Sequence, residues 1–162
     1  MCPAVQYPGV TCYFPDFVAM PGFGSKVRRP MNKILIVDDK PEARKLLAIA
    51  LRSPTREIIE AASGLAALQI IKAQKPEVVL LDVVMPGHVN GFQACEWIKD
   101  DAETKNTFVI LISGLDEKKD FDEARRVGAN AYLLKPFRLS RLAEIVANHT
   151  KLVDTFILET TR

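Results

Sequence analysis

The feature that most restricts the fold is a set of short aliphatic runs separated by segments with helical periodicity. Residues 34–37 (ILIV), 78–81 (VVLL) and 109–112 (VILI) are apolar at every position. A strand of this kind needs apolar cover on both faces, as strands have in the parallel sheet of an α/β protein. The pattern therefore predicts an α/β fold with helices on both sides of one sheet.

Strand and helix patterns alternate five times from residue 33 onward. The predicted strands cover residues 33–38, 56–61, 77–82, 108–113 and 131–134. The predicted helices cover residues 41–52, 64–75, 91–101 and 118–127, with a last helix that begins near Arg138. In the first helix Ala43, Leu46, Leu47, Ala50 and Leu51 have the spacing of a buried face. We predict a doubly wound, five-stranded parallel sheet in a three-layer αβα sandwich.

The segments outside this pattern are short. Residues 1–30 hold five of the ten prolines and show no periodicity, so we expect a disordered N-terminal extension before a domain at 31–150. No apolar run approaches the roughly 20 residues that cross a bilayer. The three cysteines (Cys2, Cys12 and Cys95) fit neither a disulfide framework nor a zinc site, which favours a cytoplasmic protein.

The charge distribution argues against nucleic acid as a partner. The net charge of +2 comes from residues 1–30, which leaves nineteen basic and nineteen acidic side chains in residues 31–162. A nucleic-acid-binding domain normally carries a clear basic excess. We therefore expect partners that are proteins or small ions.

Polar side chains follow four of the five predicted strands. Asp38 and Asp39 follow the first strand, and Asp82, Ser113 and Lys135 end or follow the third, fourth and fifth. The carboxyl ends of parallel strands meet at one edge of the sheet, where α/β proteins bind their ligands. Clustered carboxylates without His or Cys indicate a hard cation, Mg²⁺ or alternatively Mn²⁺. A divalent cation, an ammonium group and a nucleophilic carboxylate together suit phosphoryl transfer.

These residues stand in motifs that resemble the receiver domain of two-component response regulators. The resemblance extends from Lys33 to about Val146 and includes DDKP at 38–41, LLDVVMPG at 80–87, NG at 90–91, LISG at 111–114 and GANAYLLKPF at 128–137. It implies a flavodoxin-like fold with strand order 2-1-3-4-5. It also implies a signalling module rather than a metabolic enzyme, with self-phosphorylation and slow self-dephosphorylation as its only chemistry.

The resemblance assigns roles to individual positions. Asp82 resembles the phospho-acceptor, Asp39 a direct Mg²⁺ ligand and Asp38 a largely water-mediated one. The backbone carbonyl of Val84 would complete the protein's metal ligands. Lys135 would hold a phosphoryl oxygen, with a cis peptide before Pro136.

The resemblance also implies a switch and two kinds of partner. Ser113 and Tyr132 match the hydroxyl and aromatic positions that move in response to the phosphate. Their movement would alter the face made by the fourth helix, fifth strand and fifth helix, where a target protein would dock. The phosphoryl donor would be a histidine kinase or a histidine phosphotransfer protein, as part of a phosphorelay.

The sequence departs from the family pattern near the acceptor. The loop at 85–91 is one residue longer than the commonest spacing, and Asn90 stands where Asp is usual. Val84 and Leu115 are apolar at positions that resemble those setting the phosphate lifetime, and they cannot orient an attacking water. This predicts slow self-dephosphorylation.

Other functions remain as alternatives. The chain could be the receiver fragment of a hybrid histidine kinase, although the short stretch after Lys135 favours a stand-alone receiver. An aspartyl-phosphate hydrolase of the haloacid dehalogenase type would need an acid at position 84, which is Val84. A flavin carrier of similar fold would need hydroxyls and amides where Asp38 and Asp39 stand.

The C-terminal segment admits two interpretations. Leu142, Val146, His149, Val153 and Phe156 recur at steps of three and four, which predicts that residues 151–162 extend the last helix. Such a helix would offer a seam for a partner or for a homodimer. Alternatively, the segment frays and folds back on the core, which we slightly favour.

Overall fold

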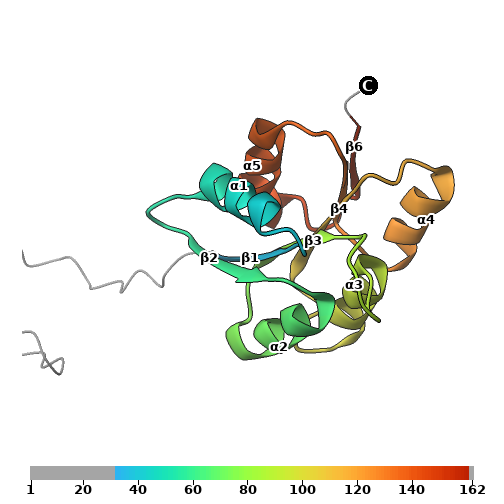
Figure 1. Ribbon diagram of the computed structural model, residues 1–162, viewed down its shortest axis with the longest axis horizontal. Coiled ribbons are helices and arrows are strands. Elements are labelled where there is room, and N and C mark those ends of the chain that lie inside the picture. The colour runs from blue at the N-terminus through green and yellow to red at the C-terminus, as the bar shows by residue number, and fades with distance from the viewer. Residues whose placement is uncertain (1–31, 161–162) are drawn as a thin grey trace, which may run out of the picture.

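The computed structural model describes residues 32–160, and within them it has one six-stranded, fully parallel sheet (Figure 1). The strand order is β2-β1-β3-β4-β5-β6. The strands are β1 (Lys33–Val37), β2 (Glu57–Ala61), β3 (Val78–Asp82), β4 (Phe108–Ser113), β5 (Ala131–Leu134) and β6 (Ile157–Glu159). The first five strands have the predicted order, and β6 is additional.

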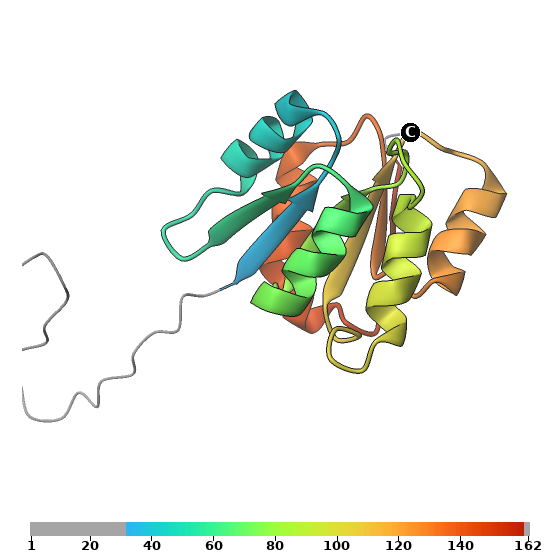
Figure 2. The same cartoon turned by 60° about the horizontal axis from the view of Figure 1, so that its bottom comes forward.

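Helices cover both faces of the sheet and make the predicted three layers (Figure 2). They are α1 (Pro41–Leu51), α2 (Gly64–Gln74), α3 (Gly91–Asp100), α4 (Lys118–Arg126) and α5 (Leu139–Asn148), followed by the 3₁₀ helix η1 (His149–Lys151). Helices α1 and α5 pack on one face, and α2, α3 and α4 pack on the other. For every strand and helix whose start and end were both predicted, the predicted ends lie within one residue of the observed ends.

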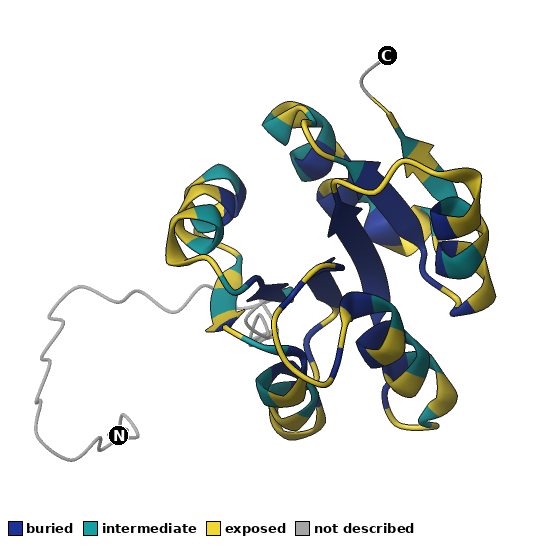
Figure 3. Ribbon diagram, turned by 45° about the vertical axis from the view of Figure 1, so that its right-hand side comes forward, coloured by how far each residue is buried: buried dark blue, intermediate teal, exposed yellow. Residues whose placement is uncertain are grey.

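The aliphatic runs that predicted the fold are its core. Every residue of β3 and β4 is buried, and the alternate side chains of β1, β3 and β4 divide between the two helical layers. Figure 3 shows these central strands as fully buried, whereas β6 at the edge is only partly covered. Because neighbouring parallel strands end at the same level, this core also fixes where the residues after each strand lie.

Two predictions about helices were wrong. Leu46 of α1 is exposed, because Leu47 and Leu51 face the sheet and Ala48 completes the contact. The predicted extension of the last helix over residues 151–162 is contradicted in its described part, residues 151–160: α5 ends at Asn148, and β6 follows η1 and a turn. The segment instead folds back on the core, which was the alternative interpretation.

Two further predictions concern the ends of the chain and membranes. The predicted disorder of residues 1–30 lies outside the described residues. Within residues 32–160, no helix is both long and apolar enough to cross a membrane.

Candidate functional site

Three carboxylates meet at the carboxyl edge of the sheet because of the strand register. Val37 of β1 pairs with Leu81 of β3, so Asp38 and Asp82 lie next to each other one residue further along. Carboxylate oxygens of Asp38, Asp39 and Asp82 all lie within 4.8 Å of one another. Asp38 and Asp82 are buried, and Asp39 is half-buried. The structure therefore brings the predicted acidic residues together.

Lys135 brings a positive charge to this cluster from the end of β5. Its Nζ lies 2.8 Å from Oδ1 of Asp82 and 3.7 Å from Oδ2 of Asp38. Its backbone N–H donates to the carbonyl of Ser113 at 2.7 Å, which ties the residue to the end of β4. The Lys135–Pro136 peptide is cis, as predicted. Four residues from three strand ends thus form one polar site.

The electrostatics of the site disfavour an ionised Asp82. Burial is the largest effect and raises the pKa of this carboxyl above its ordinary value. The hydrogen bond and charge of Lys135 lower the pKa, and the neighbouring charges of Asp38 and Asp39 raise it again. One ammonium group does not balance three crowded carboxylates, so the donor set fits a divalent cation bound by oxygen.

The backbone around Asp38 and Asp39 is held by contacts that the sequence analysis missed. The Oδ1 atom of Asp38 accepts a hydrogen bond from the N–H of Lys40 at 2.8 Å. Nη1 of Arg44 donates to the carbonyls of Asp38 at 2.8 Å and Asp39 at 3.4 Å, while its Nε contacts Glu60 at 3.0 Å. Because Arg44 binds main-chain oxygens, no side-chain pairing in the sequence indicated this role.

Gly91 is a second residue whose importance was missed. A Cβ atom at this position would lie 2.4 Å from the carbonyl oxygen of Asp82 and 2.6 Å from the Cα of Val83. The Gly91 N–H also donates to the carbonyl of Val83 at 3.0 Å. Only glycine lets α3 start this close to Asp82, and its place in the 90–91 motif was the available signal.

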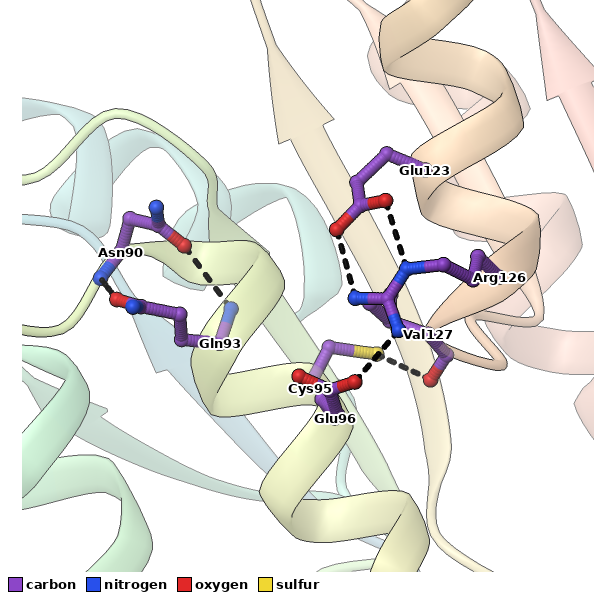
Figure 4. Close-up of polar contacts among 7 residues, drawn as sticks. All are labelled: Asn90, Gln93, Cys95, Glu96, Glu123, Arg126 and Val127. Atoms are coloured by element: carbon purple, nitrogen blue, oxygen red, sulfur yellow. Dashed lines mark hydrogen bonds and ion pairs between the residues drawn. The ribbon is translucent and has the colours of Figure 1, made fainter.

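The long loop before α3 is closed by a capping box. The Oδ1 atom of Asn90 accepts from the N–H of Gln93 at 2.9 Å, and Oε1 of Gln93 accepts from the N–H of Asn90 at 3.1 Å (Figure 4). Val89 is buried, and its Cγ1 would lie 3.0 Å from a Cβ on Gly64. Asn90 therefore caps the helix, and the longer loop is anchored by an apolar contact.

Ser113 at the end of β4 and Tyr132 in β5 both form hydrogen bonds with the backbone of Leu115. The Ser113 hydroxyl accepts from the Leu115 N–H at 3.1 Å, and the Tyr132 hydroxyl donates to the Leu115 carbonyl at 2.7 Å. The Tyr132 ring is fully buried and packs edge-on against Phe121, with centroids 5.3 Å apart. Burial raises the pKa of Tyr132, and a hydrogen bond with Ser113 opposes that shift.

Apolar side chains stand two residues beyond Asp82 and two residues beyond Ser113. Val84 follows Asp82 by two residues and is 60% exposed, and Leu115 follows Ser113 by two residues and is also exposed. Neither side chain can hydrogen-bond to water. The predicted role of the Val84 carbonyl as a metal ligand stays a prediction.

A family model described as the response regulator receiver domain matches residues 34–147. Protein PilH of Pseudomonas aeruginosa is 40% identical over 106 residues, which cover 65% of this chain and 87% of PilH. The polar-differentiation response regulator DivK of Brucella ovis is 30% identical over 118 residues, which cover 73% of this chain and 95% of DivK.

A solved structure shows the same fold. The chemotaxis protein CheY4 of Vibrio cholerae superposes with a TM-score of 0.67 and 27% sequence identity. The superposition covers 73% of this chain and 98% of CheY4.

Proposed function

Because the chain belongs to the response regulator receiver domain family, we propose that it accepts a phosphoryl group on Asp82 and signals the change to a partner protein. The observation that carries this proposal is the contact of Asp82 with Lys135 at 2.8 Å inside a cluster of three carboxylates. This arrangement holds a nucleophile, an ammonium group and a set of oxygen ligands within one site.

Asp38, Asp39 and Asp82 would hold Mg²⁺, with the carbonyl of Val84 as a further ligand and Mn²⁺ as an alternative ion. The oxygen-only donor set supports this choice of metal. When bound, the cation would neutralise charge on the phosphoryl oxygens and favour the ionised form of Asp82. The side chains of Asp82 and Lys135 would carry out the transfer step.

In the transfer step, a carboxylate oxygen of Asp82 attacks the phosphorus of a phosphohistidine. A new O–P bond forms as the N–P bond breaks, and the imidazole leaves with the electron pair of that bond and takes up a proton. The Lys135 ammonium group, already oriented toward Asp82, would bind a phosphoryl oxygen and stabilise its charge. The donor would be a histidine kinase or a histidine phosphotransfer protein.

Ser113 and Tyr132 would transmit the new charge to the surface. A phosphoryl group adds about −1.5 to −2 charges, which would attract the Ser113 hydroxyl away from its present contact with Leu115. The Leu115 carbonyl accepts a hydrogen bond from the Tyr132 hydroxyl, so a shift of residues 113–115 would alter the packing of Tyr132. The affected surface is the face made by α4, β5 and α5, where a target protein would dock.

The chain is a signalling domain by its family, rather than a metabolic enzyme. Its own dephosphorylation would be slow, which the apolar Val84 and Leu115 support. We place it in the cytoplasm, where a phosphohistidine donor and Mg²⁺ are available. A hydrolase of the haloacid dehalogenase type finds no support, because Val84 has no acidic group to serve as the general acid.

The experiment is incubation of the full chain with acetyl phosphate, followed by intact-mass measurement of acid-labile phosphate. We expect Mg²⁺-dependent labelling of the wild type and none of Asp82→Asn. Asp100→Asn is the matched control, because Asp100 lies at the far end of α3, and it should label as the wild type does. Labelling that persists in Asp82→Asn would refute the assignment of the acceptor.

A further inference from the structure

The sixth strand pairs with the outer edge of β5. Ile157 pairs with Ala131, Leu158 with Tyr132 and Glu159 with Leu133, all in parallel register. Figure 1 shows β6 beside β5, between α5 and α4. It was not expected from the sequence, because its three residues are too few to show a strand period.

Both flanking helices contact this segment through specific side chains. On the α4 side, the Arg125 guanidinium lies 4.9 Å from the centroid of the Phe156 ring. On the α5 side, Nε of Arg141 lies 3.0 Å from Oε2 of Glu159. At the start of the segment, Nδ2 of Asn130 donates to the Val153 carbonyl at 3.1 Å. The surroundings of β6 thus select an aromatic residue at one end and an acid at the other.

The apolar side chains of the segment enter both cores. Phe156 packs, as Phe121 does, against the cluster that contains Tyr132, and Ile157 packs against the opposite cluster, which contains Leu133 and Leu142. In this segment Ile157 and Glu159 stay partly exposed, and Leu158 is exposed. A three-residue edge strand with partial burial belongs to the parts of a fold that open most readily.

We propose that the edge of β5 between α4 and α5 is a strand-binding groove that β6 occupies in cis and that a partner protein can occupy in its place. The partner would present an extended segment with an aromatic residue, then an aliphatic residue and, two residues further on, an acidic residue, as Phe156, Ile157 and Glu159 do. The position between the last two is not selected, because Leu158 is exposed. The ladder of β5, the two apolar clusters and the cations of Arg125 and Arg141 select that pattern. Strand addition to an exposed sheet edge is an established mode of peptide recognition.

This groove lies on the face through which the proposed switch would signal, and the regulatory meaning of the inference rests on that function. Tyr132 is the residue that pairs with Leu158, and Phe156 packs against the Tyr132 cluster. A seated β6 therefore keeps Tyr132 covered. A partner strand must compete with an occupant whose tether gives it an effective concentration on the order of millimolar.

The test measures binding of a labelled peptide with the sequence of residues 153–162 (VDTFILETTR) by fluorescence anisotropy. The receiving protein is the full chain with Phe156→Ser and Ile157→Ser, which releases β6. We expect this variant to bind the peptide tighter than the wild type by about tenfold or more, since the wild-type groove is mostly occupied. Val153→Ser, a change at an exposed side chain outside β6, is the matched control and should behave as the wild type.

Hydrogen exchange identifies the bound edge. In the released variant, amides of β5 that face β6 should exchange faster, while those of β1, β3 and β4 stay protected, and the peptide should restore β5 protection. If the double variant fails to fold, Glu159→Lys replaces it as a milder variant. It places a second cation beside Arg141 without changing either core, and hydrogen exchange in β6 should become faster.

Equal peptide affinity for all variants, or no binding to the folded released variant, would overturn the proposal. Dimerisation of the released variant without peptide binding would also overturn it, in favour of a surface for a second copy. The assay contains neither Mg²⁺ nor a phosphoryl donor, so it can succeed even if Asp82 is not a phospho-acceptor.

Discussion

Replacing Lys135 with methionine tests the electrostatic balance of the site in the absence of metal. The ammonium group lies 2.8 Å from Asp82, where unit charges at an effective dielectric constant of 20 attract by roughly 6 kcal/mol. The Lys135 side chain is 40% exposed, and water screens much of this attraction. We expect Lys135→Met to lower the free energy of unfolding by roughly 1–3 kcal/mol, which lies between the losses typical of exposed and of buried ion pairs.

Magnesium should reduce the loss of stability that Lys135→Met causes. In Lys135→Met the cation no longer competes with an ammonium group for the carboxylate of Asp82, so Mg²⁺ should bind more tightly and stabilise the variant more than the wild type. Urea unfolding at neutral pH, with EDTA and then with a fixed Mg²⁺ concentration, measures both quantities. The gap between the two proteins is expected to narrow when Mg²⁺ is added.

Lys118→Met provides the matched control. Its Nζ lies even closer to a carboxylate, 2.6 Å from Asp122, but the side chain is 88% exposed. The change at Lys118 should alter stability by less than about 0.5 kcal/mol and should not respond to Mg²⁺. The reasoning fails if Lys135→Met in EDTA is as stable as the wild type, or if Mg²⁺ stabilises the variant and the wild type equally.

Four other perturbations have defined outcomes. Asp82→Asn should stabilise the metal-free protein at neutral pH. Because the pKa of Asp82 is raised in the folded state, the wild type loses stability as the pH rises through that folded-state pKa. The urea midpoint should therefore fall less steeply with rising pH in the variant than in the wild type. Gly91→Ala should lower the free energy of unfolding by about 1–3 kcal/mol, because the new Cβ would meet the Asp82 carbonyl at 2.4 Å. Val84→Asn should shorten the lifetime of the phosphorylated protein, measured by intact mass after removal of the donor, since an amide can orient water where Val84 cannot. Cys95, with its pKa raised to about 12 by burial and its Sγ donating to the Val127 carbonyl (Figure 4), should resist alkylation at pH 8 in the folded protein and react in urea, as peptide mapping can show.

Each of these outcomes can be contradicted. A steeper pH dependence in Asp82→Asn would show that Asp82 is stabilised as an anion. Wild-type stability of Gly91→Ala would show that α3 can move away from Asp82. A wild-type phosphate half-life of only seconds would refute the argument from apolar neighbours. Rapid alkylation of Cys95 would show that α3 and α4 separate readily in solution.

The aliphatic strands made the fold predictable, because residues that are apolar at every position leave few alternatives to a covered parallel sheet. The site followed from the same pattern: once Val37 and Leu81 are placed in adjacent strands, Asp38 and Asp82 must meet. Contacts that involve the backbone were not predictable. Arg44 binds carbonyl oxygens, and Gly91 allows α3 to approach Asp82 because it has no side chain.

The extended helix predicted for the C-terminal segment is wrong because the helical spacing of its apolar residues continues past the end of the helix. Leu142 and Val146 truly face the core from α5, and continuing their spacing to Val153 and Phe156 predicted more helix. The helix ends instead near His149, which is buried against Phe108 with Nδ1 2.7 Å from the Val146 carbonyl. Tertiary contacts with the β5 edge then determine the conformation of residues 157–159, and a three-residue strand offers no local signal.

Borohydride trapping tests the central claim most directly, because it reduces an aspartyl phosphate to homoserine at the residue that carried it. The full chain would be phosphorylated with Mg²⁺ and acetyl phosphate, reduced, digested and sequenced by mass spectrometry. We predict homoserine at position 82 and aspartate at positions 38 and 39. Homoserine at another position, or none in a sample that carries acid-labile phosphate, would contradict the role of Asp82.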